Sequence, residues 1–205
     1  MSDMEAHERI MDGIKRGVDR HWRFTKNLLR IKPEYLLTVS VADALTDGFN
    51  DICGLDLEIK LEEPTRAIST DLLLAAVGWR NFFKSIIAPV TRKGKVDIYV
   101  THNTDSWIIE LKGFDPSAAE IHKDLVRLRE FLTANGGNHK CRGCFLAFPT
   151  ATDSNGWIKQ QLDASQSVGV VYSERVETRE DPEDGIPVYH ANCIALSYAR
   201  AQRTT

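Results

Sequence analysis

The chain has 205 residues, of which 42% are hydrophobic and 27% are charged, and its formal net charge is −3. These values are typical of one water-soluble domain and argue against a nucleic-acid coat protein, because any contact with phosphates would have to come from a local basic patch. The first residues are polar, and no stretch approaches the roughly eighteen apolar residues of a membrane span. We therefore expect a cytoplasmic protein with no membrane partner.

Apolar residues recur with helical spacing across residues 5–30, and no proline interrupts them before Pro33. Pro33 suits the first position of a second helix, which we predict over residues 33–45. We interpret residues 1–32 as an N-terminal helical extension and residues 33–205 as the main domain. Because the apolar stripe of the first helix has no evident partner in the core, it favours a homodimer.

The rest of the chain alternates predicted strands and helices. In chain order we predict a strand over 55–64, a helix over 69–82, strands over 82–90, 95–100 and 106–112, a helix over 116–135, a strand over 144–150, a helix over 155–166, and strands over 168–176 and 188–199. The short turns between the strands at 82–90, 95–100 and 106–112 predict two consecutive hairpins. This order indicates an α/β domain with a central mixed sheet flanked by helices.

Two of these strands carry charged residues where a half-buried sheet would be apolar. Alternation puts Glu110 and Lys112 on one face and Ile109 on the other, and it separates Asp97 from Ile98 in the same way. If the apolar sides of both strands face one helix layer, two carboxylates and an ammonium group converge opposite it. Two carboxylates suit Mg²⁺, which keeps several waters, and a neighbouring lysine can hold or help deprotonate a metal-bound water. Such a site hydrolyses phosphodiesters.

The strand "VDIYV" with Asp97, followed by "IIELKG" with Glu110 and Lys112, resembles the signature of the PD-(D/E)xK nuclease superfamily. The resemblance covers roughly residues 33–150, although Val96 stands where the superfamily usually has proline. It implies a restriction-endonuclease-like three-layer core and metal-dependent cleavage of a nucleic acid, with DNA as the expected substrate. It also implies Mg²⁺ as the cofactor, with Mn²⁺ as a substitute, Asp97 and Glu110 as metal ligands, and Lys112 at the attacking water.

Many members of that superfamily carry a further acidic residue before the sheet. Glu34 is our first candidate for this metal ligand, Glu62 is the second and Asp71 the third. Glu34 can also be explained without a metal, because an acidic residue in the first turn of a helix is stabilised by the helix dipole. The choice among the three stays open.

Basic residues flank the predicted acidic site. The candidates for contacts with a nucleic-acid backbone are Arg92, Lys93 and Lys95 in the turn before the first acidic strand, and Lys123 and Arg127 in the helix after the second. The alternative is a catalytically silent or regulatory module of the same fold that binds a protein or nucleic-acid partner. A titration with divalent metal would separate the two hypotheses.

The four cysteines of the chain are too few for the disulfide framework of a small secreted domain, so we expect reduced thiols. A competing interpretation is a structural zinc site built from His139, Cys141, Cys144, His190 and Cys193. Because Cys144 and Cys193 lie in apolar strands, where cysteine behaves as a small hydrophobic residue, we favour core thiols.

Overall fold

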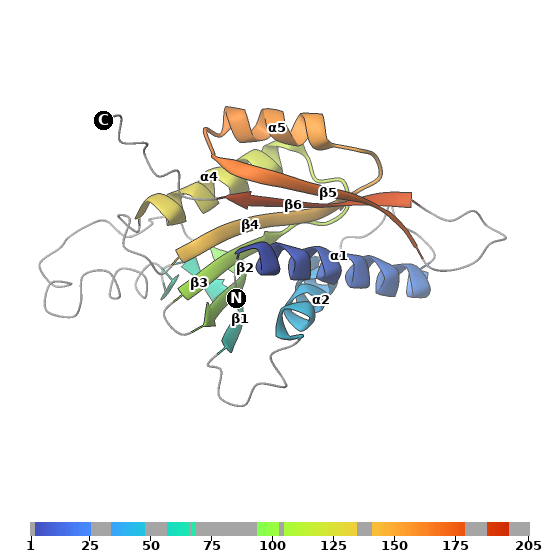
Figure 1. Ribbon diagram of the computed structural model, residues 1–205, viewed down its shortest axis with the longest axis horizontal. Helices are drawn as coiled ribbons and strands as arrows, with labels where there is room; N and C mark the ends of the chain where they lie inside the picture. The colour runs from blue at the N-terminus through green and yellow to red at the C-terminus, as the bar shows by residue number, and fades with distance from the viewer. Residues whose placement is uncertain are drawn as a thin grey trace, which may run out of the picture.

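The computed structural model describes residues 3–25, 34–47, 57–65, 67–68, 94–102, 105–134, 141–178 and 188–196. Within these residues one mixed sheet of six strands has the order β1-β2-β3-β4-β6-β5, and four helices accompany it (Figure 1). The elements are α1 (Asp3–Thr25), α2 (Glu34–Thr46), β1 (Leu57–Pro64), β2 (Lys95–His102), β3 (Asp105–Leu111), α4 (Ala118–Ala134), β4 (Cys141–Thr150), α5 (Asn155–Ala164), β5 (Gly169–Glu177) and β6 (Val188–Leu196). The predicted α/β class is confirmed.

The sheet is antiparallel except at its centre. β1 pairs with β2 and β2 with β3 in antiparallel register, β3 and β4 are parallel, and β6 is antiparallel to both β4 and β5. The parallel pair is joined through α4, as a parallel connection requires a crossover. The predicted hairpin between residues 82–90 and β2 is wrong, because β1 occupies that edge of β2, with Leu61 opposite Ile98. Residues 69–93 lie outside the described part.

One face of the sheet is covered by α1 and α2, which share a core with the strands (Figure 1). On α1, Ile10, Ile14 and Val18 are fully buried and belong to the same cluster as Ile98 and Trp107. The apolar stripe of α1 therefore packs within its own chain. The surface on which we based the expected homodimer is not free for a second copy.

The two helices of this layer approach each other closely at glycines. A Cβ atom added at Gly13 would lie 2.4 Å from the Cα of Val41, and one added at Gly17 would lie 2.8 Å from the Cδ2 of Leu37. A larger residue at Gly13 would require a backbone shift, whereas one at Gly17 would require the Leu37 side chain to move, because protein interiors are close-packed. The glycines thus set the distance between α1 and α2.

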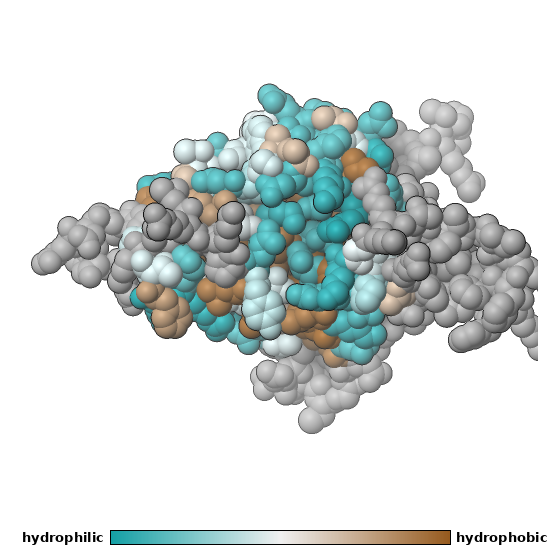
Figure 2. Space-filling view, turned by 180° about the vertical axis from the view of Figure 1, so that it is seen from behind, coloured by the Kyte–Doolittle hydropathy of each residue, from teal (hydrophilic) through white to brown (hydrophobic). Residues whose placement is uncertain are grey.

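The other face is covered by α4 and α5. On α4, Ile121, Leu125, Leu128 and Leu132 form an apolar stripe, and all four are buried in the second core cluster. Figure 2, which views the molecule from behind, shows hydrophilic residues gathered over the middle of the surface, with smaller hydrophobic patches beside them. None of the helices in the described part of the chain is long and apolar enough to cross a membrane.

Candidate functional site

The register of β2 and β3 brings the two predicted acidic residues together. Ile98 lies opposite Ile109 in the last pair of this antiparallel register, and Asp97 and Glu110 are the residues next to that pair on the two strands. The backbone N–H of Leu111 donates a hydrogen bond to Asp97 Oδ2 at 2.7 Å. This bond fixes the Asp97 carboxylate beside the end of β3.

Burial makes both of these carboxyl groups reluctant to ionise, and the negative charge of Asp97 adds to this effect at Glu110. Burial raises the pKa of Asp97, although the Leu111 N–H and the charge of Lys112 oppose it. Burial, followed by the negative charge of Asp97, raises the pKa of Glu110 to about 9, with Arg127 acting in the opposite direction. Two carboxylates that share one buried space favour either a proton or a cation between them.

Helix α4 supplies two charged partners to the site. Lys112 Nζ lies 3.0 Å from Asp124 Oδ2, and Arg127 Nη2 lies 3.2 Å from Asp124 Oδ1 and also contacts Glu110 Oε2. The side chains of Glu110 and Asp124 are only 2% and 5% exposed. Burial alone would lower the pKa of Lys112, but Asp124 raises it above its ordinary value, so Lys112 stays an ammonium ion.

One buried oxygen of Glu110, Oε1, has no hydrogen-bond partner among the described residues. Among these residues, no group of three or more His, Cys, Asp or Glu side chains is arranged to hold a metal ion. Mg²⁺ is commonly held by only one or two carboxylates and completes its shell with water, so Asp97 and Glu110 fit this ion as a two-carboxylate set.

A groove of about 470 Å³ gives access to Lys112. Its lining consists of Glu34, Lys112, Gly113, Phe114, Asp115, Pro116 and Glu120. The loop after β3 is tied to β4, because Asp115 N donates to Pro149 O at 3.0 Å and Asp115 Oδ1 accepts from Ala151 N at 2.9 Å. A substrate could therefore approach Lys112 over a fixed loop.

Of the three candidates for a further acidic ligand, Glu34 lies at this groove. It is exposed at the start of α2, and its charge raises the pKa of both Asp97 and Lys112. Glu62 instead forms an exposed ion pair with Lys95 at 2.8 Å. Asp71 lies outside the described residues.

The described candidates for phosphate contacts differ in exposure, although Arg127 Nη1 donates a hydrogen bond to the backbone oxygen of Lys95 at 3.3 Å. Lys123 is exposed on α4, and Lys95 is exposed but paired with Glu62. Arg127 points into the site and binds Glu110 and Asp124, with only 15% of its side chain exposed. Arg92 and Lys93 lie outside the described residues.

Asp124 is a site residue that was not predicted from the sequence. It lies three residues after Ile121 and four before Leu128, on the apolar stripe of α4, and it is nonetheless buried. A carboxylate in the middle of an apolar stripe needs a buried partner, because an unpaired charge in a core is costly. The position of Asp124 within an apolar stripe was the sequence signal that could have identified it as a site residue.

The zinc interpretation is wrong for the cysteines that the structure describes. Cys144 belongs to the core beneath α4 and α5, whereas Cys193 belongs to the core beneath α1 and α2. They lie on opposite faces of the sheet and cannot share an ion. Cys141, Cys144 and Cys193 are free thiols, and His139 lies outside the described residues.

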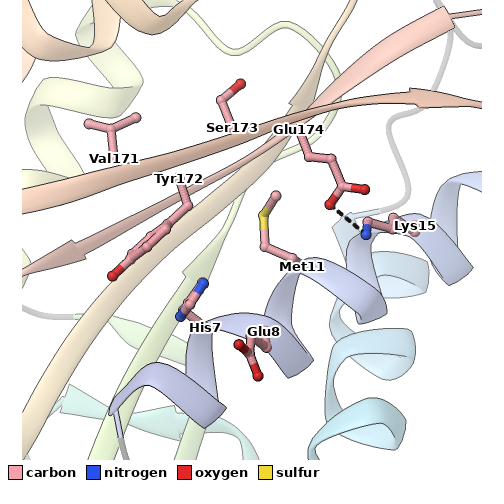
Figure 3. Close-up of a pocket in the computed structure, with 8 residues that line it drawn as sticks. All are labelled: His7, Glu8, Met11, Lys15, Val171, Tyr172, Ser173 and Glu174. Atoms are coloured by element: carbon pink, nitrogen blue, oxygen red, sulfur yellow. Dashed lines mark ion pairs between the residues drawn. The ribbon is translucent and has the colours of Figure 1, made fainter.

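A second groove, of about 550 Å³, lies between α1 and the edge strand β5 (Figure 3). The His7 ring stacks on Tyr172 with ring centroids 3.7 Å apart, and Lys15 pairs with Glu174 at 2.6 Å. Figure 3 shows Met11 between these two contacts. None of the predicted site residues lines this groove, so we treat it as part of the packing of α1 against β5.

Comparison with protein-family models finds no match for this chain. Comparison with curated proteins and with solved structures likewise finds no match. The functional assignment therefore rests on the geometry of the site itself.

Proposed function

We propose that this chain is a metal-dependent nuclease of the restriction-endonuclease-like, PD-(D/E)xK type that hydrolyses phosphodiester bonds, with DNA as the expected substrate. The observation that carries the proposal is the convergence of Asp97 and Glu110 beside Lys112, with Glu110 Oε1 buried and without a hydrogen bond from the described residues. Mg²⁺ is the proposed cofactor, and Mn²⁺ would replace it.

The order of elements supports the same assignment. Among the described elements, helix α2, strands β1, β2 and β3, helix α4 and strand β4 follow one another in this order, and a helix, three strands, a helix and a strand are also the order expected of the superfamily's core; residues 66 and 69–93, between β1 and β2, lie outside the described residues. The acidic pair lies on the second and third of these strands, and the helix that follows supplies Asp124 and Arg127.

Each residue has a definite role in this proposal. Asp97 and Glu110 hold the cation. When bound, a divalent cation acidifies a water molecule and neutralises charge on the phosphate. Lys112 is kept protonated by Asp124, so it stabilises the attacking oxygen and the phosphate through its positive charge and does not act as a base.

The second candidate function is a catalytically silent or regulatory module of the same fold that binds a protein or nucleic-acid partner. The observation in its favour is the contact between Arg127 and Glu110, because a guanidinium group already lies beside this carboxyl group. In this alternative Arg127 replaces the cation permanently, and divalent metals do not bind.

Cleavage of plasmid DNA and of single-stranded DNA and RNA oligonucleotides in Mg²⁺ or Mn²⁺ tests the proposal. Alanine at Asp97 or Glu110 should abolish cleavage, whereas Lys112→Ala should slow it by roughly a hundredfold or more. Glu58→Ala, which removes an exposed carboxylate of β1, is the matched control and should cut normally. Robust cleavage by Glu110→Ala would show that the mechanism is wrong.

A further inference from the structure

We propose that Cys141 and Cys144 form a redox-active dithiol, which exchange with a small-molecule disulfide such as oxidised glutathione converts into an intramolecular disulfide. The inference is independent of the proposed nuclease activity, because neither thiol has a role in that mechanism. It concerns a modification site at the start of β4.

The geometry begins with an irregularity in the sheet. Two residues three positions apart in a regular strand point to opposite faces. Between β3 and β4, however, the register shifts, so that Ser106 faces Cys141 and Trp107 faces Gly143. Arg142 is thus an extra residue, as in a β-bulge, and it returns Cys141 and Cys144 to the same face.

The bulge brings the two thiols together. Their sulfur atoms lie 3.7 Å apart, and both residues pack against the core beneath α4 and α5. Bond formation requires the two sulfur atoms, whose side chains already share a face, to approach from 3.7 Å to the disulfide separation of about 2.0 Å. This sulfur contact is the observation that carries the proposal.

The two cysteines differ in access. Cys141 is half-buried at the first position of β4, whereas Cys144 is fully buried. Burial raises the pKa of the Cys144 thiol, so Cys144 is a poor first nucleophile. Cys141 is therefore the residue that meets the oxidant, and Cys144 is the residue that closes the bond.

The exchange balances in two steps. The Cys141 thiolate attacks one sulfur of oxidised glutathione, which forms a mixed disulfide, breaks the glutathione S–S bond and releases one glutathione thiolate. Cys144 then gives up its proton and attacks the Cys141 sulfur, which forms the bond between Cys141 and Cys144 and releases the second glutathione. The protein loses two hydrogen atoms, and glutathione disulfide takes up the two electrons.

Trypsin provides a direct readout in the full chain. The experiment uses Cys53→Ser as the parent, because Cys53 lies outside the described residues and would add a fourth thiol. Cleavage after Lys140 and Arg142 separates Cys141 from Cys144, so their peptides stay joined only through a disulfide. The protein is treated with oxidised glutathione, its remaining free thiols are blocked, and it is then digested. We expect the two peptides linked by a disulfide, and not two separate peptides that each carry a blocked cysteine. A reductant should separate the linked peptides.

Single variants test the order of the steps. With Cys144→Ala, Cys141 should accumulate as the mixed disulfide with glutathione, whereas Cys141→Ser should give neither adduct nor cross-link. Cys193→Ala, which removes a buried thiol from the opposite face of the sheet, should behave like the parent. Two blocked cysteines in the treated parent, or bound zinc that protects both, would overturn the proposal. Even if Cys144→Ala does not fold, the peptide analysis of the parent still shows whether Cys141 and Cys144 form a disulfide.

Discussion

Lys112 Nζ lies 3.0 Å from Asp124 Oδ2, so a buried carboxylate on α4 holds the lysine of the candidate site. The side chain of Lys112 is 17% exposed and that of Asp124 is 5% exposed, so water screens this pair only weakly. Asp124 therefore both orients Lys112 and keeps it charged. In the proposed nuclease it is a positioning residue.

Asp124→Asn should reduce cleavage by about 10-fold to 100-fold, the usual effect of losing a residue that orients a functional group. Because Asp124 raises the pKa of Lys112, its removal lets that pKa fall. The alkaline limb of the pH–rate profile should move to lower pH, while Mg²⁺ affinity is retained.

Asp163→Asn, an exposed change on α5, is the matched control for this experiment. A loss of activity that is equal at every pH would indicate a structural role for Asp124 and would contradict the assignment.

Glu110 should make the metal-free fold less stable as pH rises. Its pKa of about 9 lies above the ordinary value of 4.5, so between these values the folded protein keeps a proton that the unfolded chain has released. The free energy of unfolding then falls with rising pH, by up to about 1.4 kcal/mol per pH unit. Below the unfolded pKa both states are protonated, and this contribution to pH dependence vanishes.

Glu110→Gln removes the titrating group, so its melting temperature relative to the wild type should rise steadily from about pH 5 to about pH 9. Thermal melts in a chelator measure this difference. Glu58→Gln on the exposed side of β1 should show no such trend. A constant difference between Glu110→Gln and the wild type would show that Glu110 does not hold a proton in the folded state.

Gly13→Ala tests whether α1 belongs to the core. Alanine improves helix propensity by up to about 1 kcal/mol, but its Cβ would lie 2.4 Å from the Cα of Val41. Overpacking of this kind costs about 1–3 kcal/mol, so we expect net destabilisation in urea unfolding. Gly156→Ala in α5 adds a Cβ into open space and should be neutral or slightly stabilising. Equal stability of the two variants would contradict the close approach of α1 and α2.

The sequence could predict most of this site because strand alternation is a local property. Alternation and a single hairpin sufficed to bring Asp97, Glu110 and Lys112 together. The partner of β2 could not be found in this way, because residues 82–90 were near in sequence, whereas β1 pairs across a much longer separation. Local spacing favours the short hairpin and carries no information on long-range pairing.

The packing partner of α1 is another long-range contact that local spacing could not predict. Its apolar stripe was evident from the sequence, but whether the stripe faced a second copy or its own sheet was not. Gly13 and Gly17, four residues apart, indicate close helix packing. The sequence did not show that α2 is the helix that packs against them. Asp124 was overlooked because an isolated acidic residue is usually on the solvent side of a helix.

Binding of Mn²⁺, measured by calorimetry and electron paramagnetic resonance, tests whether Asp97 and Glu110 form a divalent-cation site. The wild type and Lys112→Ala should each bind one ion per chain. Asp97→Asn and Glu110→Gln should each weaken binding by at least about tenfold, because each loses a charged ligand. Unchanged binding in both carboxylate variants, or no binding by the wild type, would show that Asp97 and Glu110 do not form a cation site.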